Sequence, residues 1–261
     1  MMYALLIALS AFAASFVSFY SGFGLGTALT AVFCLFYPAE IAITISAIVH
    51  LLNNLYKFYL MRSHLQLAPV VPFLIAAVPS AMLGAWLLQY WAWMDKHVTY
   101  DLFSFHFSPK GTSFSLGIVL ILFAFTEGIL KVRYLRQSGT PVLFAGGLIS
   151  GFVGGLTGNQ GALRSFFLIH VIPDKKTFVA TGVAIALFLD ISRIPFYRKN
   201  LPMPESGQTF YSHLLLAVMF ALAGAWLGKK SLIKSGVNYI QTIFQFALFI
   251  LGMALVTGIV S

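Results

Sequence analysis

The stretch GGLTGNQGALRSFFL, residues 154–168, combines four glycines with an asparagine, a glutamine and an arginine inside a chain that is otherwise strongly apolar. Arg164 most needs explaining, because an arginine near the centre of a bilayer costs at least about 2.5–3.5 kcal/mol on insertion scales. A cost of that size predicts either a function or a buried partner for this side chain. The stretch interrupts an apolar region, and the prediction of the fold depends on whether this interruption breaks a membrane helix.

The composition of the chain identifies its solvent. Hydrophobic residues make up 59% of the 261 residues and charged residues 9%, and the mean hydropathy is +0.90. A soluble domain usually carries about 25% charged residues. Apolar runs of roughly 20 residues, the length that crosses a hydrocarbon core, recur along this chain. We therefore predict an all-α polytopic membrane protein with no separate soluble domain.

The hydropathy pattern divides the chain into ten apolar segments, of which about eight to ten should be membrane segments: 2–20, 24–37, 39–61, 67–90, 114–135, 141–157, 160–172, 175–196, 211–229 and 238–260. Segments 24–37 and 160–172 are too short to cross about 30 Å of hydrocarbon comfortably at 1.5 Å per residue. Each follows a glycine-containing break, SGFGLG at 21–26 and TGNQGA at 157–162. We expect two Gly-broken, re-entrant-like elements, and whether the short segments cross fully or re-enter stays open.

The two breaks belong to an internal repeat. SFVSFYSG at 15–22 aligns with GFVGGLTG at 151–158 at a shift of 136 residues. GAWL at 84–87 recurs at 224–227, a shift of 140. The shift of 136 also superposes three polar pairs, which are Asn54 and Asp190, Lys57 and Arg193, and Arg62 and Arg198. Several matches in the same order predict two diverged copies, residues 1–136 and 137–261, within one integral membrane domain.

The number of segments predicts how the two copies are oriented. Each copy holds five segments, and three net crossings remain if the short one pairs with its neighbour as a re-entrant hairpin. Both numbers are odd, so the second copy begins on the opposite side of the membrane from the first. That arrangement is an inverted-topology repeat, which many transporters share.

Basic residues in the connections predict the sidedness, because cytoplasmic loops carry an excess of Lys and Arg. One side collects Arg62, Lys131, Arg133, Arg136, Lys175, Lys176, Lys229, Lys230 and Lys234, and the other collects Lys96, Lys110, Arg198 and Lys199. The first side should be cytoplasmic, with both termini on the outer side of the cytoplasmic (inner) membrane and loop 91–113 outside. The N-terminal run resembles a signal peptide but lacks its basic n-region, so we expect it to be retained.

The two breaks are the predicted binding site for an anion. A short helix after a break presents unpaired N–H groups and about half a positive charge to a ligand, and glycine lets the ligand approach closely. The alternative is a tightly packed kink with Arg164 reaching a carbonyl or a lipid headgroup. The predicted substrate-binding residues are Gly22, Gly24, Gly158, Asn159, Gln160, Gly161 and Arg164.

A polar stripe in IVHLLNNLYKF is the second candidate feature. His50, Asn53, Asn54 and Lys57 share one helix face by their spacing, and Asp190 and Arg193 lie on the equivalent face of the second copy. In lipid such a face turns to the interior or to a wet cavity. These residues could line the pathway, or they could join helices by ion pairs and hydrogen bonds. His50 could carry a proton near neutral pH.

The signatures of most enzymes are missing. The chain contains no HExxH, CxxC, GxSxG or Walker motif. Its histidines lack ligand spacing, and its one cysteine, Cys34, excludes an internal disulfide. The net charge of +9 lies in the short connections and so reflects topology. We predict no enzymatic activity, no cofactor or metal, and no nucleic-acid partner.

The sequence resembles a known family at these breaks. GGLISGFVGGLTGNQGALRSFFLI, followed by ATGVAIALFLDISRIPFY, is similar to the second half of the sulfite exporter TauE/SafE family, and SGFGLGTALTAVFCLFYPAEIAITISAIVHLLNN is similar to its Gly-rich opening. Typical members have a denser glycine run followed by proline in each break, which this chain lacks. The resemblance implies a secondary carrier in the cytoplasmic membrane for sulfite, sulfonates or related organic anions.

The combined expectation is an anion carrier that works by alternating access. The alternatives are a passive anion channel and, less favoured, a membrane-embedded enzyme or a membrane assembly partner without transport of its own. The expected partners are a small anionic substrate and membrane lipids. A coupled proton or ion, a homodimer, the exact substrate and the direction of transport stay open.

Overall fold

The computed structural model describes residues 2–21, 24–94, 96–102, 105–130, 139–158, 160–169, 171–201, 208–230, 246 and 249–260.

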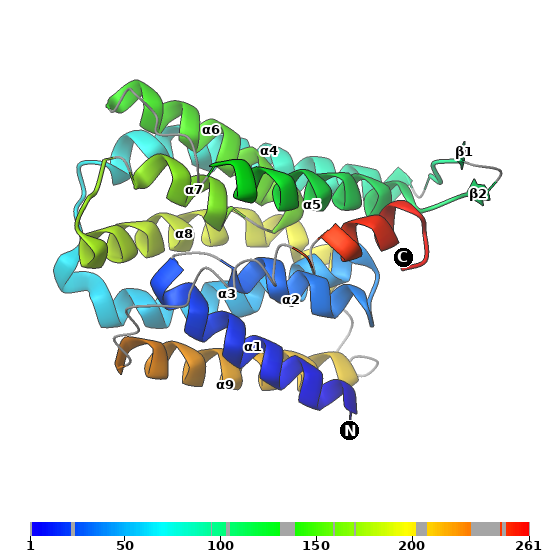
Figure 1. The fold of residues 1–261 in the computed structure, drawn as a ribbon, viewed down its shortest axis with the longest axis horizontal. Coiled ribbons are helices and arrows are strands. Elements are labelled where there is room, and N and C mark those ends of the chain that lie inside the picture. The colour runs from blue at the N-terminus through cyan, green and yellow to red at the C-terminus, as the bar shows by residue number, and fades with distance from the viewer. Residues whose placement is uncertain are drawn as a thin grey trace.

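Helices make up almost all of the described chain (Figure 1). The first half contains α1 (Met2–Ser21), α2 (Leu25–Cys34), α3 (Ala39–Met61), the 3-10 turn η1 (Arg62–His64), α4 (Val70–Met94), the strands β1 (Tyr100–Leu102) and β2 (Phe105–Phe107), and α5 (Gly111–Leu130). The second half contains α6 (Thr140–Thr157), α7 (Gly161–Leu168), α8 (Lys175–Tyr197), the 3-10 turn η2 (Arg198–Asn200) and α9 (Gln208–Lys230). Residues 249–256 are also helical. The prediction of a helical polytopic protein is confirmed.

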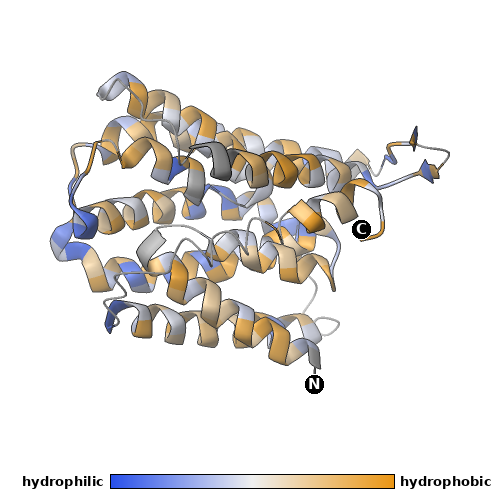
Figure 2. Ribbon diagram, in the orientation of Figure 1, coloured by the Kyte–Doolittle hydropathy of each residue, from blue (hydrophilic) through white to orange (hydrophobic). Residues whose placement is uncertain are grey.

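Five described helical stretches are long and apolar enough to cross a membrane: Ala39–His64, Val70–Ala92, Thr140–Thr157, Lys175–Asn200 and Gln208–Lys230. The apolar parts of α1, α2 and α5 are shorter. Large apolar side chains are exposed along the helices, among them Leu9, Ile75 and Leu215, as expected where lipid replaces water. Figure 2 shows hydrophilic residues concentrated at the bundle end that carries η1. The protein is therefore a multi-pass membrane protein.

The predicted 91–113 loop is shorter than expected, because α4 continues to Met94 and α5 begins at Gly111. Its described part forms the antiparallel pair of β1 and β2, with Tyr100 opposite Phe107. The Tyr100 hydroxyl donates to the carbonyl oxygen of Val256 at 2.8 Å, which ties this hairpin to the C-terminal segment. Both chain ends lie at the same end of the bundle as the hairpin (Figure 1).

Helix α8 begins at a side-chain cap. Asp174 precedes its first residue, and its Oδ2 accepts hydrogen bonds from the backbone N–H of Thr177 at 2.8 Å and from the Thr177 hydroxyl at 2.7 Å. These bonds hold the pKa of the Asp174 carboxyl below its usual range. An acidic cap of this kind satisfies N–H groups that the first turn leaves unpaired, and it sets the start of the helix that carries Asp190 and Arg193.

Glycines bring α4 and α6 into backbone contact. A Cβ at Gly151 would overlap the Ala77 carbonyl and the Ser80 hydroxyl of α4, and a Cβ at Gly155 would overlap the Ala81 carbonyl. Small residues allow such close approach in membranes, where van der Waals packing drives helix association. The glycines that precede the second break therefore hold α6 against α4.

The same kind of contact joins α1 to α9. A Cβ at Gly84 in α4 would overlap the carbonyl of Phe152 in α6, and a Cβ at Gly224 in α9 would overlap the carbonyl of Phe12 in α1. Gly84 and Gly224 begin the two GAWL sequences, and Phe12 and Phe152 differ by the same 140 positions. Each long helix of one half thus packs against a helix of the other half.

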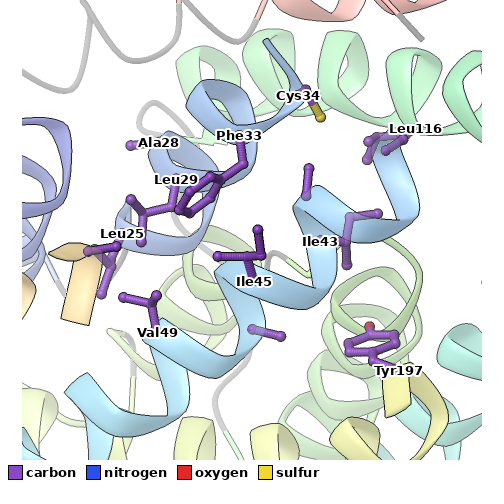
Figure 3. Close-up of a cluster of buried hydrophobic side chains, with 14 of the residues drawn as sticks. Leu25, Ala28, Leu29, Phe33, Cys34, Ile43, Ile45, Val49, Leu116 and Tyr197 are labelled. Atoms are coloured by element: carbon purple, nitrogen blue, oxygen red, sulfur yellow. The ribbon is translucent and has the colours of Figure 1, made fainter. Parts of the chain in front are cut away.

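The short helix α2 lies inside the bundle (Figure 3). Leu25, Leu29 and Phe33 are buried against Ile45 and Val49 of α3 in one apolar cluster. An apolar helix that is buried on most sides needs no polar outer face, and α2 carries no charged residue. This packing fixes the end of α2 that follows the first break.

The glycine contact between α4 and α6 makes a prediction about stability. Gly151→Ala should destabilise the protein by about 1–3 kcal/mol, because the added methyl group overlaps backbone atoms that cannot move independently. The measurement is the thermal unfolding midpoint of the purified protein in detergent.

The matched control is Gly182→Ala in α8, where the added Cβ would meet Arg164 Nε at 3.7 Å, an ordinary contact. That variant should keep the wild-type midpoint or raise it slightly, since alanine favours the helix. Equal midpoints for both variants would contradict the close crossing.

Candidate functional site

Charged side chains are buried deep between the helices. In the described ranges the buried charged residues are Lys57, Arg164, Asp190 and Arg193, each at most 3% exposed. Three are bases and one is an acid. Burying a charge is costly unless it is paired and hydrogen-bonded, so the partners of these groups determine what the site can do.

Asp190 of α8 is the centre of this network. Its Oδ1 accepts from Arg193 Nη2 at 2.6 Å, and its Oδ2 lies 2.7 Å from His50 Nδ1 and accepts from Asn54 Nδ2 at 2.9 Å. His50 and Asn54 belong to α3, so the carboxylate joins the two halves of the chain. The sequence aligns Asn54 with Asp190, and the structure places these aligned residues in direct contact.

Arg193 connects this centre to the second break. Its Nη1 donates to the carbonyl oxygen of Gly154 at 2.6 Å, and the Tyr197 hydroxyl donates to the carbonyl oxygen of Gly155. Both carbonyls lie in the last turn of α6, just before the break. The final turn of α6 is thus held by side chains of α8.

The first half contains a related contact. Lys57 Nζ donates to the hydroxyl of Ser18 in α1 at 2.7 Å. In the Asn53 amide orientation that satisfies its neighbours, the nitrogen donates to Ser15 Oγ at 2.9 Å and to the Ala221 carbonyl at 3.2 Å, and the oxygen accepts from Lys57 Nζ at 3.2 Å. Lys57 and Ser18 align with Arg193 and Gly154 at the shift of 136. In both halves a cation therefore reaches the helix that precedes the break.

Glycine ends α6 at the second break. Gly158 has φ +78°, the left-handed conformation that favours glycine, and its N–H donates to the Gly154 carbonyl at 2.9 Å. A Cβ at Gly158 would lie 3.3 Å from Ile43 Cγ2 in α3 and 3.8 Å from Thr30 Oγ1 in α2. The break thus lies beside the short helix of the first half.

Gln160 is the residue of this break that points most directly to a ligand. It precedes α7, is 2% exposed, and packs against Gly154, where a Cβ would lie 2.6 Å from Gln160 Cβ. Neither its amide oxygen nor its amide nitrogen has a hydrogen-bond partner within the described chain. Leaving a buried polar group unsatisfied costs about 1–3 kcal/mol. Thr30 Oγ1, next to the break, is buried and likewise lacks a partner among described residues.

Arg164 lies one turn into α7 and is 3% exposed. Its Nε faces Gly182 of α8, and it interacts electrostatically with Asp190, Arg193 and Lys57. The side chain is therefore part of the buried charged network and does not extend to the surface of the bundle, where lipid headgroups would lie.

Of the other four residues predicted at the breaks, the structure describes two. Gly161 begins α7. Gly24 precedes α2 with φ +108° and has open space where a Cβ would lie. Gly22 and Asn159 lie outside the described residues. From the first half, Thr30 of α2 and Ile43 of α3 lie next to Gly158 of the second break.

The sequence analysis missed four polar residues of the site: Ser15, Ser18 and Tyr197, which bond within the network, and Thr30, which lies next to the second break. Ser15 and Ser18 sit inside SFVSFYSG, the segment that revealed the repeat, but hydroxyls in an apolar helix are common and gave no separate signal. Tyr197 follows Arg193 by four positions in α8, so it shares the face of the stripe. The described residues contain no group of three potential metal ligands.

Comparison with known proteins was made at the level of families and of single proteins. The family described as Sulfite exporter TauE/SafE matches residues 7–255. No match was found among curated proteins or among solved structures.

The buried ion pair makes a prediction of its own. Asp190→Ala should lower stability by about 3–5 kcal/mol, because it leaves Arg193 buried without its carboxylate. The double variant Asp190→Leu with Arg193→Met should lose less stability than the summed losses of Asp190→Leu alone and Arg193→Met alone. The reason is that apolar residues of similar volume can replace a buried pair.

Thermal unfolding in detergent tests both expectations. It is measured for the wild type, Asp190→Ala, Asp190→Leu, Arg193→Met and the double variant. Strictly additive losses would show that Asp190 and Arg193 do not stabilise each other.

Proposed function

We propose that this chain, which belongs to the sulfite exporter TauE/SafE family, is a secondary carrier for sulfite or a related small organosulfur or organic anion, and that the anion binds at the break between α6 and α7. The match covers nearly the whole chain, and the family is one of membrane transporters.

One observation carries the binding site. The buried Gln160 amide has no hydrogen-bond partner in the described chain and packs beside Gly154, whose carbonyl Arg193 binds, in an interior where buried bases outnumber the buried acid. An oxyanion accepts hydrogen bonds from an amide N–H and from a guanidinium, and bonds to charged groups are the stronger kind. The first N–H groups of α7 are further hydrogen-bond donors for an anion. Together these groups match the chemistry of a sulfur oxyanion.

Contacts between the halves support an inverted repeat with alternating access. Asn54 and Asp190 align in sequence and touch, as residues on a two-fold axis would. Lys57 reaches Ser18, and Arg193 reaches the aligned Gly154. Rocking one unit against the other around this axis would expose the break first to one side of the membrane and then to the other.

Hydrogen bonds near the hairpin end of the bundle support a state that is closed there. The Tyr37 hydroxyl lies 2.8 Å from His213 Nδ1, and Asn200 Nδ2 donates to Thr44 Oγ1 at 3.0 Å. These bonds join the α2–α3 region of the first half to η2 and α9 of the second. We assign this end to the outer side of the cytoplasmic membrane, because the opposite end carries Arg62, Lys175, Lys176, Lys229 and Lys230.

The test is sulfite flux into liposomes that contain the purified protein, with a panel of organosulfonates for comparison. Arg164→Gln and Gln160→Leu should each lower uptake at subsaturating sulfite at least about tenfold, since each removes a hydrogen bond to a charged ligand worth about 1.5–3 kcal/mol. Arg198→Gln, which changes an exposed arginine of η2 in the same way, should keep the wild-type rate.

Wild-type rates for every anion in both site variants would exclude this binding site. A carrier should also show saturation and counterflow, in which sulfite trapped inside accelerates entry of labelled sulfite. Flux that neither saturates nor shows counterflow would identify a passive channel instead.

A further inference from the structure

We infer that a proton moves together with each anion and that the His50–Asp190 pair holds it; the inference rests on the proposed anion transport. His50 on α3 and Asp190 on α8 belong to different halves of the chain, and their side chains meet inside the bundle at 2.7 Å. A proton site at this position therefore lies at the contact between the two halves, which would move relative to each other during alternating access.

The geometry defines where the proton sits. A separation of 2.7 Å between His50 Nδ1 and Asp190 Oδ2 requires a hydrogen between them. With Nδ1–H donating to the carboxylate, the second ring nitrogen, Nε2, is left to gain or lose a proton. Within the described chain no residue is bonded to Nε2. The pair therefore exists in two states that differ by one proton on the imidazole.

The two members of the pair differ in exposure. The His50 side chain is 12% exposed, whereas the Asp190 side chain is fully buried. We therefore assign the entry of the proton to the imidazole, while the carboxylate stays in place between Arg193 and Asn54. Histidine suits this role because its side chain is the one that ordinarily gains and loses a proton between pH 5 and 8.

The surrounding charges link the proton to the anion. The titratable groups that interact with the pair are Arg164 on α7 and Arg193 and Tyr197 on α8. Lys57 on α3 interacts with Arg164. Burial opposes a positive charge on His50, Asp190 supports it, and Arg193 and Arg164 oppose it. An anion beside Gln160 and Arg164 offsets those cations and so favours the protonated imidazole. By linkage, a proton on His50 favours the anion by the same factor.

The two halves differ at this position. The shift of 136 aligns His50 of α3 with Ala186 of α8 in the sequence. Asn54, Lys57 and Ser18, in contrast, all align with residues of the second-half network. The packing of the second copy is achieved without an imidazole. His50 is therefore an addition to the shared framework, as expected of a residue that carries a separate task.

The experiment measures protons per anion in proteoliposomes of the full chain. Labelled sulfite reports anion uptake, a pH dye inside the vesicles reports proton uptake, and valinomycin with potassium clamps the membrane potential. The protons taken up by sulfite itself are obtained by titrating the vesicle contents. The wild type should carry about one further proton per sulfite, and an acidic outer buffer should accelerate its uptake several-fold.

His50→Gln should lose that further proton and the response to the pH gradient, whatever its rate. His106→Gln is the matched control, because His106 pairs with Asp101 in the exposed hairpin and should behave as the wild type. His50→Asn is read in the same way if His50→Gln shows no flux.

Each outcome has a separate meaning. Absence of sulfite counterflow in the wild type would remove the carrier itself. Counterflow with no further proton in the wild type would overturn the coupling and leave the carrier intact. A further proton that persists in the His50 variants would overturn the assignment to this pair.

Discussion

Asp190 shares one buried carboxylate among donors from two helices, and the interior of the protein depends on that sharing. The carboxylate is paired with Arg193 through one oxygen and with His50 and Asn54 through the other. Removal of charges from water is costly unless each is met by opposite charge and hydrogen bonds. This single acid therefore holds α3 to α8, neutralises part of the basic interior, and leaves an excess of positive charge toward the second break.

The glycine contacts supply what the ion pair alone cannot, which is a rigid position for the break. Gly151 and Gly155 hold α6 directly on the backbone of α4, while Arg193 and Tyr197 bind the carbonyls of its last turn. Gly158 then ends α6 beside Ile43 and Thr30. This packing keeps the unsatisfied amide of Gln160 in place, so the donors of the proposed anion site would be oriented before an anion binds.

Much of this arrangement could be predicted from the sequence. Hydropathy located the helices, and the aligned pairs Asn54 and Asp190, and Lys57 and Arg193, identified the polar face that the structure buries. The spacing could not show that Asn54 and Asp190 touch, because helix partners depend on tertiary packing. Gln160 was predicted from its place in the break, but its lack of a partner emerges only from the packed structure. Thr30 was missed because a threonine in an apolar helix usually bonds its own backbone.

The exchange of partners between the halves has a consequence for biogenesis. Helix α1 packs on α9 and α4 packs on α6, so residues such as Phe12 and Gly224 must meet across more than two hundred positions of chain. The ribosome releases the first half long before its packing partners exist. At that stage Lys57 could already bind Ser18, which belongs to the same half. Asn54 would still lack its partner Asp190. The polar interior can therefore be complete only when the helices of the second half are in place.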